Sequence, residues 1–371
     1  MINTSDLAQK AYLGEWLTKE EAMFLYLNAG DGELMETAHH IRLKLHPEPV
    51  VTWIIDRNVN LTNICVSFCK FCNFCRRGQD EDAYITTLEQ YREKIDNLYQ
   101  LGGRQLLLQG GMHPTLGLDY YITLFKNLKS EYPQLKLHAL GPPEIVHLAK
   151  MEQTDFQTVL TELRKAGLDS LPGAGAEILV DRVRRIVSKG KCGTEDWLEV
   201  MRIAHRMHLP TSATMMFGHV ETLEERVEHL FRIRDLQAEK PTDSLGFLNF
   251  VPWPFMDEGT VLREEMNIRN SVDTRQYIRL LALSRIILPN ISHIQASWLT
   301  VGKSAGQICL HAGADDFGSV MIEENVVSSA GAQNKMDSAG MQAAIREAGF
   351  TPRRRNQLFL EESHNIIPVR E

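Results

Sequence analysis

The chain has 371 residues, of which 43% are hydrophobic and 24% are charged, and its formal net charge is −8. This composition is typical of a globular protein. The acidic balance excludes a nucleic-acid or anionic-membrane surface, because both need a clustered basic face. The polar amino-terminal sequence lacks the pattern of a secretory signal, and no apolar run reaches the roughly 18 residues of a membrane helix. We therefore expect a cytoplasmic protein without membrane insertion.

The first 47 residues predict helices only. One helix is expected over 18–30, where Thr18 and acidic residues begin it and Gly30 ends it. A second helix is expected over 31–45, before Pro47. We expect this amino-terminal extension, residues 1–47, to cover the bottom or the rim of the domain that follows over 48–371.

From residue 48 onward, short apolar runs alternate with amphipathic segments. Runs of this kind predict strands buried on both faces of a parallel sheet, and they lie near 52–61, 105–109, 135–140, 168–171, 211–217, 245–252, 292–298 and 315–321. Helices are expected over 87–101, 118–131, 155–166, 194–208, 222–238, 273–288 and 338–348. The repeated alternation predicts an α/β fold, a (β/α)8 barrel of the TIM type.

Two of these helices begin with the pattern of a capping box, in which a Thr and a Glu three residues later bond each other's backbone amides. Thr86 and Glu89 form the pattern before helix 87–101, and Thr222 and Glu225 form it before helix 222–238. Both helices are therefore expected to begin at these threonines.

Four of the six cysteines lie within the eleven residues from Cys65 to Cys75, in the segment NLTNICVSFCKFCNFCR. Cys65, Cys69 and Cys72 have the spacing C-x3-C-x2-C and follow the first expected strand, at the rim where barrel enzymes place their chemistry. Thiolates are the usual ligands of iron–sulfur clusters, and four normally hold four irons. Three ligands leave one iron open, and an open iron can chelate S-adenosylmethionine (SAM).

Two other interpretations of the cysteines remain open. A zinc-stabilised binding protein would use Cys75 as a fourth ligand, although structural zinc usually takes two separated pairs of ligands. Alternatively, the cysteines are unligated and buried. Cys192 and Cys309, outside the loop, are interpreted as packing residues only.

The C-x3-C-x2-C spacing, with the aromatic Phe71 before the last cysteine, resembles the radical SAM superfamily. Over residues 50–350, the chain more closely resembles the cyclic dehypoxanthinyl futalosine synthases of the futalosine route to menaquinone, in LLLQGGMHP, LHALGPPEIVH, GAGAEILVDRVRR, ATMMFGHVET and DDFGSVMIEENVVSSAG. Aminofutalosine synthases and deazaflavin-forming synthases are nearby relatives. These relatives usually carry Ala-Phe-Tyr-Arg where this chain has Asn73-Phe74-Cys75-Arg76. We interpret Cys75 as a packing change, because a fourth thiolate would block the open iron.

The resemblance implies a radical SAM oxidoreductase with a 4Fe–4S cluster on Cys65, Cys69 and Cys72, and with SAM consumed as co-substrate. It implies dehypoxanthine futalosine as the substrate, hydrogen abstraction from its ribose, and ring closure on its aryl group. It also implies a flavodoxin or a ferredoxin as the electron donor.

Six residues are expected to contact the cofactors. Phe71 lies near the SAM adenine in this superfamily. The others have plain structural alternatives: a turn for the glycines, and a surface carboxylate that opens a helix for Glu177. Alternation lets only one of Met215 and Met216 face the lumen. The expected cofactor-binding residues are Phe71, Gln109, Gly110, Gly111, Glu177 and Met216.

The catalytic residues cannot be assigned from sequence, but His138, Glu144 and His219 are candidates at strand ends. Pro142-Pro143 is expected to form a stiff turn before Glu144. Arg57 lies within the first strand, where it either binds the substrate carboxylate or closes a buried ion pair. Further pocket candidates near strand ends are Thr214, Trp253, Gln295, Ser297, Trp298, Asp316, Ser319, Glu323 and Glu324.

Overall fold

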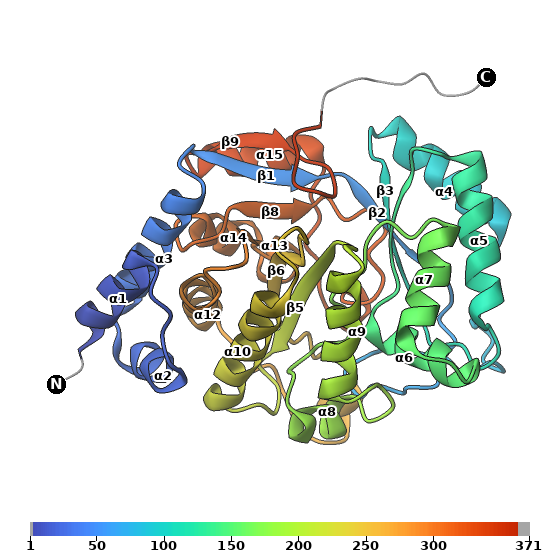
Figure 1. Cartoon of the computed structure of the whole chain (residues 1–371), viewed down its shortest axis with the longest axis horizontal. Coiled ribbons are helices and arrows are strands. Elements are labelled where there is room, and N and C mark those ends of the chain that lie inside the picture. Colours follow the sequence, from blue (N-terminus) through green and yellow to red (C-terminus); the bar gives the residue numbers. More distant parts are fainter. Residues whose placement is uncertain (1–2, 363–371) are drawn as a thin grey trace.

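Parallel strands form a closed barrel with helices around it, as expected (Figure 1). The computed structural model describes residues 3–362. Pairing follows the orders β2-β3-β4, β5-β6-β7 and β8-β1, and isolated bridges through residues 170–171, Gln295 and Arg57 close the ring. The barrel strands are β1 (Val50–Ile54), β2 (Asp56–Asn60), β3 (Gln105–Gln109), β4 (Lys136–Ala139), β5 (Thr211–Phe217), β6 (Phe247–Pro254), β7 (His293–Ile294) and β8 (Asp316–Ser319).

The strands expected over 52–61 and 168–171 differ from the prediction. The first is divided into β1 and β2, because its neighbour changes at Ile55: β2 pairs with β3, whereas β1 pairs with β9 (Thr351–Arg354). The second is reduced to bridges from Ser170 to His138 and from Leu171 to Thr211. β9 was not predicted.

The outer helices form where their amphipathic patterns predict them. Several short helices were not predicted, and Pro142-Pro143 forms the first turn of one of them rather than a stiff turn. The predicted helices are α4 (Leu88–Gln100), α5 (Leu118–Glu131), α7 (Phe156–Ala166), α9 (Thr194–Arg206), α10 (Leu223–Glu239), α12 (Thr274–Ile287) and α15 (Ser338–Glu347). The additional helices are α6 (Pro142–Met151), α8 (Asp181–Val187), α11 (Val261–Glu264), α13 (Trp298–Val301) and α14 (Lys303–Leu310).

The capping box of α10 is confirmed, but that of α4 lies one residue later than predicted. Thr87 accepts from the Gln90 amide at 3.3 Å, and Gln90 Oε1 accepts from the Thr87 amide at 2.8 Å. Thr86 is buried instead, and its hydroxyl donates to the carbonyl of Asn60 at 2.7 Å. The Thr86 side chain therefore connects the start of α4 to β2 by a hydrogen bond, and Thr87 is the residue that caps the helix.

The amino-terminal extension consists of α1 (Thr4–Leu13), α2 (Lys19–Asn28) and α3 (Asp31–Leu45). It lies against the side of the barrel, where α2 contacts α10 and α3 contacts α12 (Figure 1). Arg279 of α12 donates to the carbonyl of Tyr26 at 2.6 Å and pairs with Asp31 at 2.5 Å. The extension therefore lies along the side of the barrel, and its end reaches the predicted bottom, where His46 lies 3.3 Å from Asp315.

The amino-terminal end of the barrel is closed by residues 355–361, here called the floor segment. It follows β9, and the Arg355 amide donates to the carbonyl of Trp53 at 2.9 Å. Arg355, Gln357 and Phe359 line the interior of the barrel. Arg354 instead lies at an outer depression with Lys136. Residues 363–371, the end of the domain expected over 48–371, lie outside the described residues.

Candidate active site

The barrel encloses a cavity of about 390 Å³ that reaches from the cysteine loop to the floor segment. This size is ordinary for a site that holds small molecules. The residues that line it include ten of the predicted site residues: Cys65, Cys69, Phe71, Cys72, Gln109, Gly110, Gly111, His138, Glu144 and Glu177.

The cysteine loop is fixed against the end of β3 by close backbone contacts. A Cβ added to Gly111 would lie 2.1 Å from the carbonyl oxygen of Ile64, so only glycine fits there. The Met112 amide donates to Cys65 Sγ at 3.3 Å. Ser67 Oγ lies 3.1 Å from Cys65 Sγ and 3.3 Å from Cys69 Sγ. The Gly-Gly segment therefore positions the cysteine ligands through its lack of side chains.

The spacing of the thiols tests the zinc interpretation. Tetrahedral zinc with bonds of about 2.3 Å brings its sulfur ligands to within roughly 3.8 Å of one another. Among the described residues, the group of three or more side chains placed to hold a single ion is His46, His293 and Asp315, whose ligand atoms lie within 4.8 Å of one another. The positions of the loop cysteines therefore give no support to a zinc site.

Hydrogen bonding distinguishes Cys65 from Cys75. Hydrogen bonds with Cys75, Ser67 and the Met112 amide lower the pKa of Cys65 to about 5, against the effect of burial. The same Cys75 contact raises the pKa of Cys75, so that it keeps its proton. Burial raises the pKa of Cys69 to about 12, although the Lys191 charge opposes this effect. Cys75 therefore remains a protonated thiol, which donates to the Cys65 carbonyl at 3.5 Å.

A buried ion cluster lies beside the cysteine loop. Glu177 is 5% exposed, so the alternative of a surface carboxylate is wrong. Its carboxylate lies 2.8 Å from Lys191 Nζ and 3.4 Å from Arg184 Nη1. Lys191 Nζ also lies 5.2 Å from the centroid of the Phe71 ring. Lys191 and Arg184 were missed by the sequence analysis, because only the folded chain brings them to Glu177.

Glu144 and His138, two of the catalytic candidates, line the cavity in different environments. Glu144 Oε2 accepts from the Gly141 amide at 3.1 Å, and burial raises the pKa of Glu144 to about 7 although Lys191 opposes the shift. His138 Nδ1 lies 2.5 Å from Ser170 Oγ. Burial and the Arg355 charge lower the pKa of His138 to about 3. Glu144 is therefore near its titration point at neutral pH, whereas His138 is neutral.

The structure does not bring Met216 or His219 to the cavity. Met216 is buried in the core, and His219 lies against Glu221 at 3.0 Å with no exposed side-chain surface. Arg57 closes an ion pair with Glu323 at 2.9 Å, as one of its two interpretations predicted. Asp316 does not line the cavity either, and its carboxylate pairs with Arg355. The later-strand candidates that do line the cavity are Thr214, Trp253, Gln295, Ser297, Trp298, Ser319 and Glu324.

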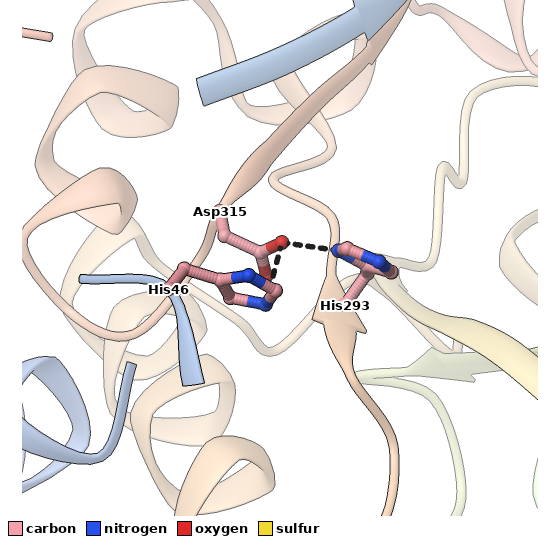
Figure 2. A group of neighbouring side chains, drawn as sticks. All are labelled: His46, His293 and Asp315. Atoms are coloured by element: carbon pink, nitrogen blue, oxygen red, sulfur yellow. Dashed lines mark hydrogen bonds and ion pairs between the residues drawn. The ribbon is translucent and has the colours of Figure 1, made fainter. Parts of the chain in front are cut away.

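Figure 2 shows a cluster of His46, His293 and Asp315. It lies at the floor end of the barrel, because the His293 ring stacks on Phe359 of the floor segment with centroids 3.9 Å apart. His293 Nδ1 donates to Asp315 at 2.5 Å, and Arg285 pairs with Asp315 at 2.6 Å. The two imidazole rings are stacked, with centroids 4.8 Å apart and an interplanar angle of 21°. Lone pairs in nearly parallel planes do not converge on one ion. We therefore interpret the cluster as a hydrogen-bonded anchor.

Comparison with known families agrees with the geometry of the cysteine loop. Residues 59–233 match the radical SAM superfamily, and residues 244–366 match the CofH/MqnC C-terminal region. The chain belongs to the radical SAM superfamily. A 4Fe–4S cluster and SAM are therefore the cofactors of this radical SAM enzyme. Within residues 3–362, no helix is long and apolar enough to cross a membrane.

Two relatives of this radical SAM enzyme are cyclic dehypoxanthine futalosine synthases. The chain is 40% identical to the protein of Streptomyces coelicolor, over 94% of this chain and 86% of the relative. It is 39% identical to the protein of Halalkalibacterium halodurans, over 96% and 95%. A third relative, the 5-amino-6-(D-ribitylamino)uracil–L-tyrosine 4-hydroxyphenyl transferase of Methanopyrus kandleri, is 37% identical over 88% of each chain.

Solved structures share the fold of this radical SAM enzyme. Methylornithine synthase superposes with a TM-score of 0.70 at 18% identity, over 93% of this chain and 97% of that chain. The FeFe-hydrogenase maturase HydG of Carboxydothermus hydrogenoformans superposes with a TM-score of 0.70 at 15% identity, over 96% and 80%. At these identities the comparison supports the barrel architecture alone.

Proposed function

We propose that this enzyme converts dehypoxanthine futalosine to cyclic dehypoxanthinyl futalosine in menaquinone biosynthesis. The observation that supports this function best is the 40% identity to a cyclic dehypoxanthine futalosine synthase along 94% of the chain. The cavity agrees with it, because aromatic and amide side chains such as Trp253, Asn249 and Gln295 suit an aryl carboxylate that is joined to a ribose-derived sugar.

Cys65, Cys69 and Cys72 would hold the cluster, and Cys75 would remain a thiol. Phe71, the segment Gln109–Gly111 and Glu177 would hold SAM, with Lys191 fixed between Glu177 and Phe71. When bound, the cluster supplies the electron that splits SAM into methionine and a 5′-deoxyadenosyl radical. The cavity lies inside the barrel, so its wall would limit the access of water to the radical.

In the proposed reaction, a hydrogen atom leaves the ribose C4′ and forms 5′-deoxyadenosine. C4′ then bonds to the aryl ring, and the ring radical passes one electron to a one-electron acceptor, such as an oxidised flavodoxin or ferredoxin, and one proton to a base, which gives the spirocyclic product. Glu144 is the candidate that suits the role of proton acceptor, because it lines the cavity and its pKa is about 7.

The proton transfer is tested by the pH dependence of kcat. A base must be deprotonated, so the wild-type kcat should rise with pH through an apparent pKa near 7. Glu144→Gln should lower kcat and remove this rise of kcat with pH. If the rise persists in the variant, the titrating group is a different residue.

The electron donor is a flavodoxin or a ferredoxin in this proposal, and the reaction takes place in the cytoplasm, where thiols stay reduced. A reduced flavodoxin should support turnover in place of dithionite. If neither protein delivers electrons, the donor has a different chemistry.

The function is tested by anaerobic turnover with dehypoxanthine futalosine, SAM and dithionite, followed by mass analysis. We expect the cyclised product and free 5′-deoxyadenosine. The transferase of Methanopyrus kandleri favours a second candidate, a reaction of tyrosine, so tyrosine-dependent SAM cleavage would support that function instead. An adduct that retains the deoxyadenosyl group would indicate an aminofutalosine synthase. A colourless preparation with one zinc would indicate a binding protein.

A further inference from the structure

The end of the cavity far from the cysteines is formed by the floor segment, which belongs to the CofH/MqnC C-terminal region. Arg355 lies beside Trp53 in the first strand, and the cysteine loop begins after Asn60. Seven residues of strand, roughly 20 Å, separate these two levels of the barrel. One cavity extends over this distance, because both the loop cysteines and Arg355 line it.

Arg355 is a fixed cation at this far end. Asp316 accepts from Arg355 Nε at 2.6 Å and from Nη2 at 3.1 Å, and the ring of Phe359 covers the guanidinium at 3.8 Å. The carbonyl of Asn356 accepts from Nη1 at 3.3 Å. A guanidinium has five N–H donors, so donors remain for a second acceptor. Its planar fork is also held in place before any ligand binds.

The distribution of charge along the cavity singles out Arg355. Among the described residues that line it, the permanent cations are Lys191 and Arg355. Lys191 is held next to Cys69 by Glu177, at the SAM end. Arg57, the sequence-based candidate for the substrate carboxylate, is paired with Glu323 and does not line the cavity. Arg355 lies close enough to His138, another residue of the cavity lining, for its charge to lower the pKa of that imidazole.

We propose that the floor segment forms the distal subsite of the substrate, in which Arg355 binds the carboxylate of the aryl ring. Gln357 and His138, which both bond Ser170, form the polar wall of this subsite. The inference deepens the proposed function, on which it rests, by naming the residue that recognises the aryl acid. Charge-assisted bonds to a guanidinium are short and directional, so this contact also orients the ring for closure.

The test compares dehypoxanthine futalosine with its aryl carboxamide in the reconstituted full-length enzyme. We expect the wild-type enzyme to prefer the carboxylate by roughly 10- to 100-fold in kcat/KM, the range of one hydrogen bond to a charged group. Arg355→Gln should reduce this preference to near one, mainly through a higher KM. Arg354→Gln is the matched control, because Arg354 faces the outer depression, and it should keep the preference.

Removal of Arg355 alone leaves Asp316 without its partner, so Arg355→Gln/Asp316→Asn, which removes both charges, is measured in parallel. SAM binding and cluster absorbance confirm that each variant is assembled. If the wild-type enzyme turns over dehypoxanthine futalosine and both variants keep its preference for the carboxylate, the proposed subsite is overturned and the proposed function stands. Wild-type enzyme that turns over neither compound would overturn both.

Discussion

The four clustered cysteines differ in what each side chain contacts. Cys75 donates to the carbonyl of Cys65 at 3.5 Å, whereas Cys65 accepts from its neighbours. The spacing of the first three predicts cluster ligands from sequence alone. The role of Cys75 could not be predicted, because it depends on the fold of the loop rather than on spacing.

Replacement of single cysteines should separate ligands from the hydrogen-bond donor. Cys69→Ala should abolish SAM cleavage, because a cluster with two thiolates is not retained. Cys75→Ala should keep the iron content and reduce SAM cleavage by no more than a few-fold. Iron content and 5′-deoxyadenosine release after anaerobic reconstitution measure both effects. Loss of iron in Cys75→Ala would make Cys75 a ligand.

The buried carboxylate of Glu177 gives a second prediction at this scale. Glu177→Gln leaves Arg184 and Lys191 buried without their counter-ion, so the free energy of unfolding should fall by about 3 kcal/mol. Glu162→Gln, which breaks the exposed pair with Lys165, is the control and should change it by about 0.5 kcal/mol or less. Urea unfolding measures both, and equal effects would contradict the buried pairing.

The beginning of α4 illustrates the limits of local sequence patterns. Thr86-Thr87 and Glu89-Gln90 offer two capping boxes that are one residue apart. Thr87→Ala should cost about 1 kcal/mol, since it removes the cap. Glu89→Ala should cost only a few tenths, because Glu89 contributes through charge near the helix start. Thermal unfolding of the two variants distinguishes the two possible boxes, and a larger loss of stability in Glu89→Ala would favour the first.

The regular elements were predictable from sequence where one residue pattern determines them. The apolar faces of α4 and α10 and the run 105–109 are examples. β9 was missed because TPRR has no apolar alternation, and Pro352 is tolerated since β9 pairs only with β1 among the described strands. The division at Ile55 and the ion cluster of Glu177 also depend on partners that are distant in sequence.

At the scale of the whole molecule, the Asp315 anchor joins the extension, α12 and two barrel strands (Figure 2). Burial alone would raise the pKa of Asp315, but the hydrogen bond from His293 and the Arg285 charge hold it well below its usual range. A carboxylate with a lowered pKa in the folded state stabilises the fold above the pKa of the unfolded chain. This stabilisation is lost as the pH falls.

Asp315→Asn should therefore lower the free energy of unfolding at pH 7 by about 3 kcal/mol, because Arg285 loses its buried partner. Wild-type stability should decrease as the pH drops below about 4, where unfolded Asp residues begin to bind protons, and the variant should show a flatter curve. Urea titrations between pH 7 and pH 3.5 measure both slopes. Parallel curves would show that other carboxylates set the acid limit.

β1 pairs with β9 through Val50 and Thr351, which are far apart in the chain, so this pairing can form only after β9 has been made. Loop-closure entropy over such a separation must be overcome before the pairing contributes stability. During synthesis the growing chain lacks its floor until residues 355–361 have been added. The cysteine loop and its Gly-Gly support, by contrast, are complete once residue 111 has been added. Assembly at the cofactor end can thus precede the formation of a closed reaction chamber.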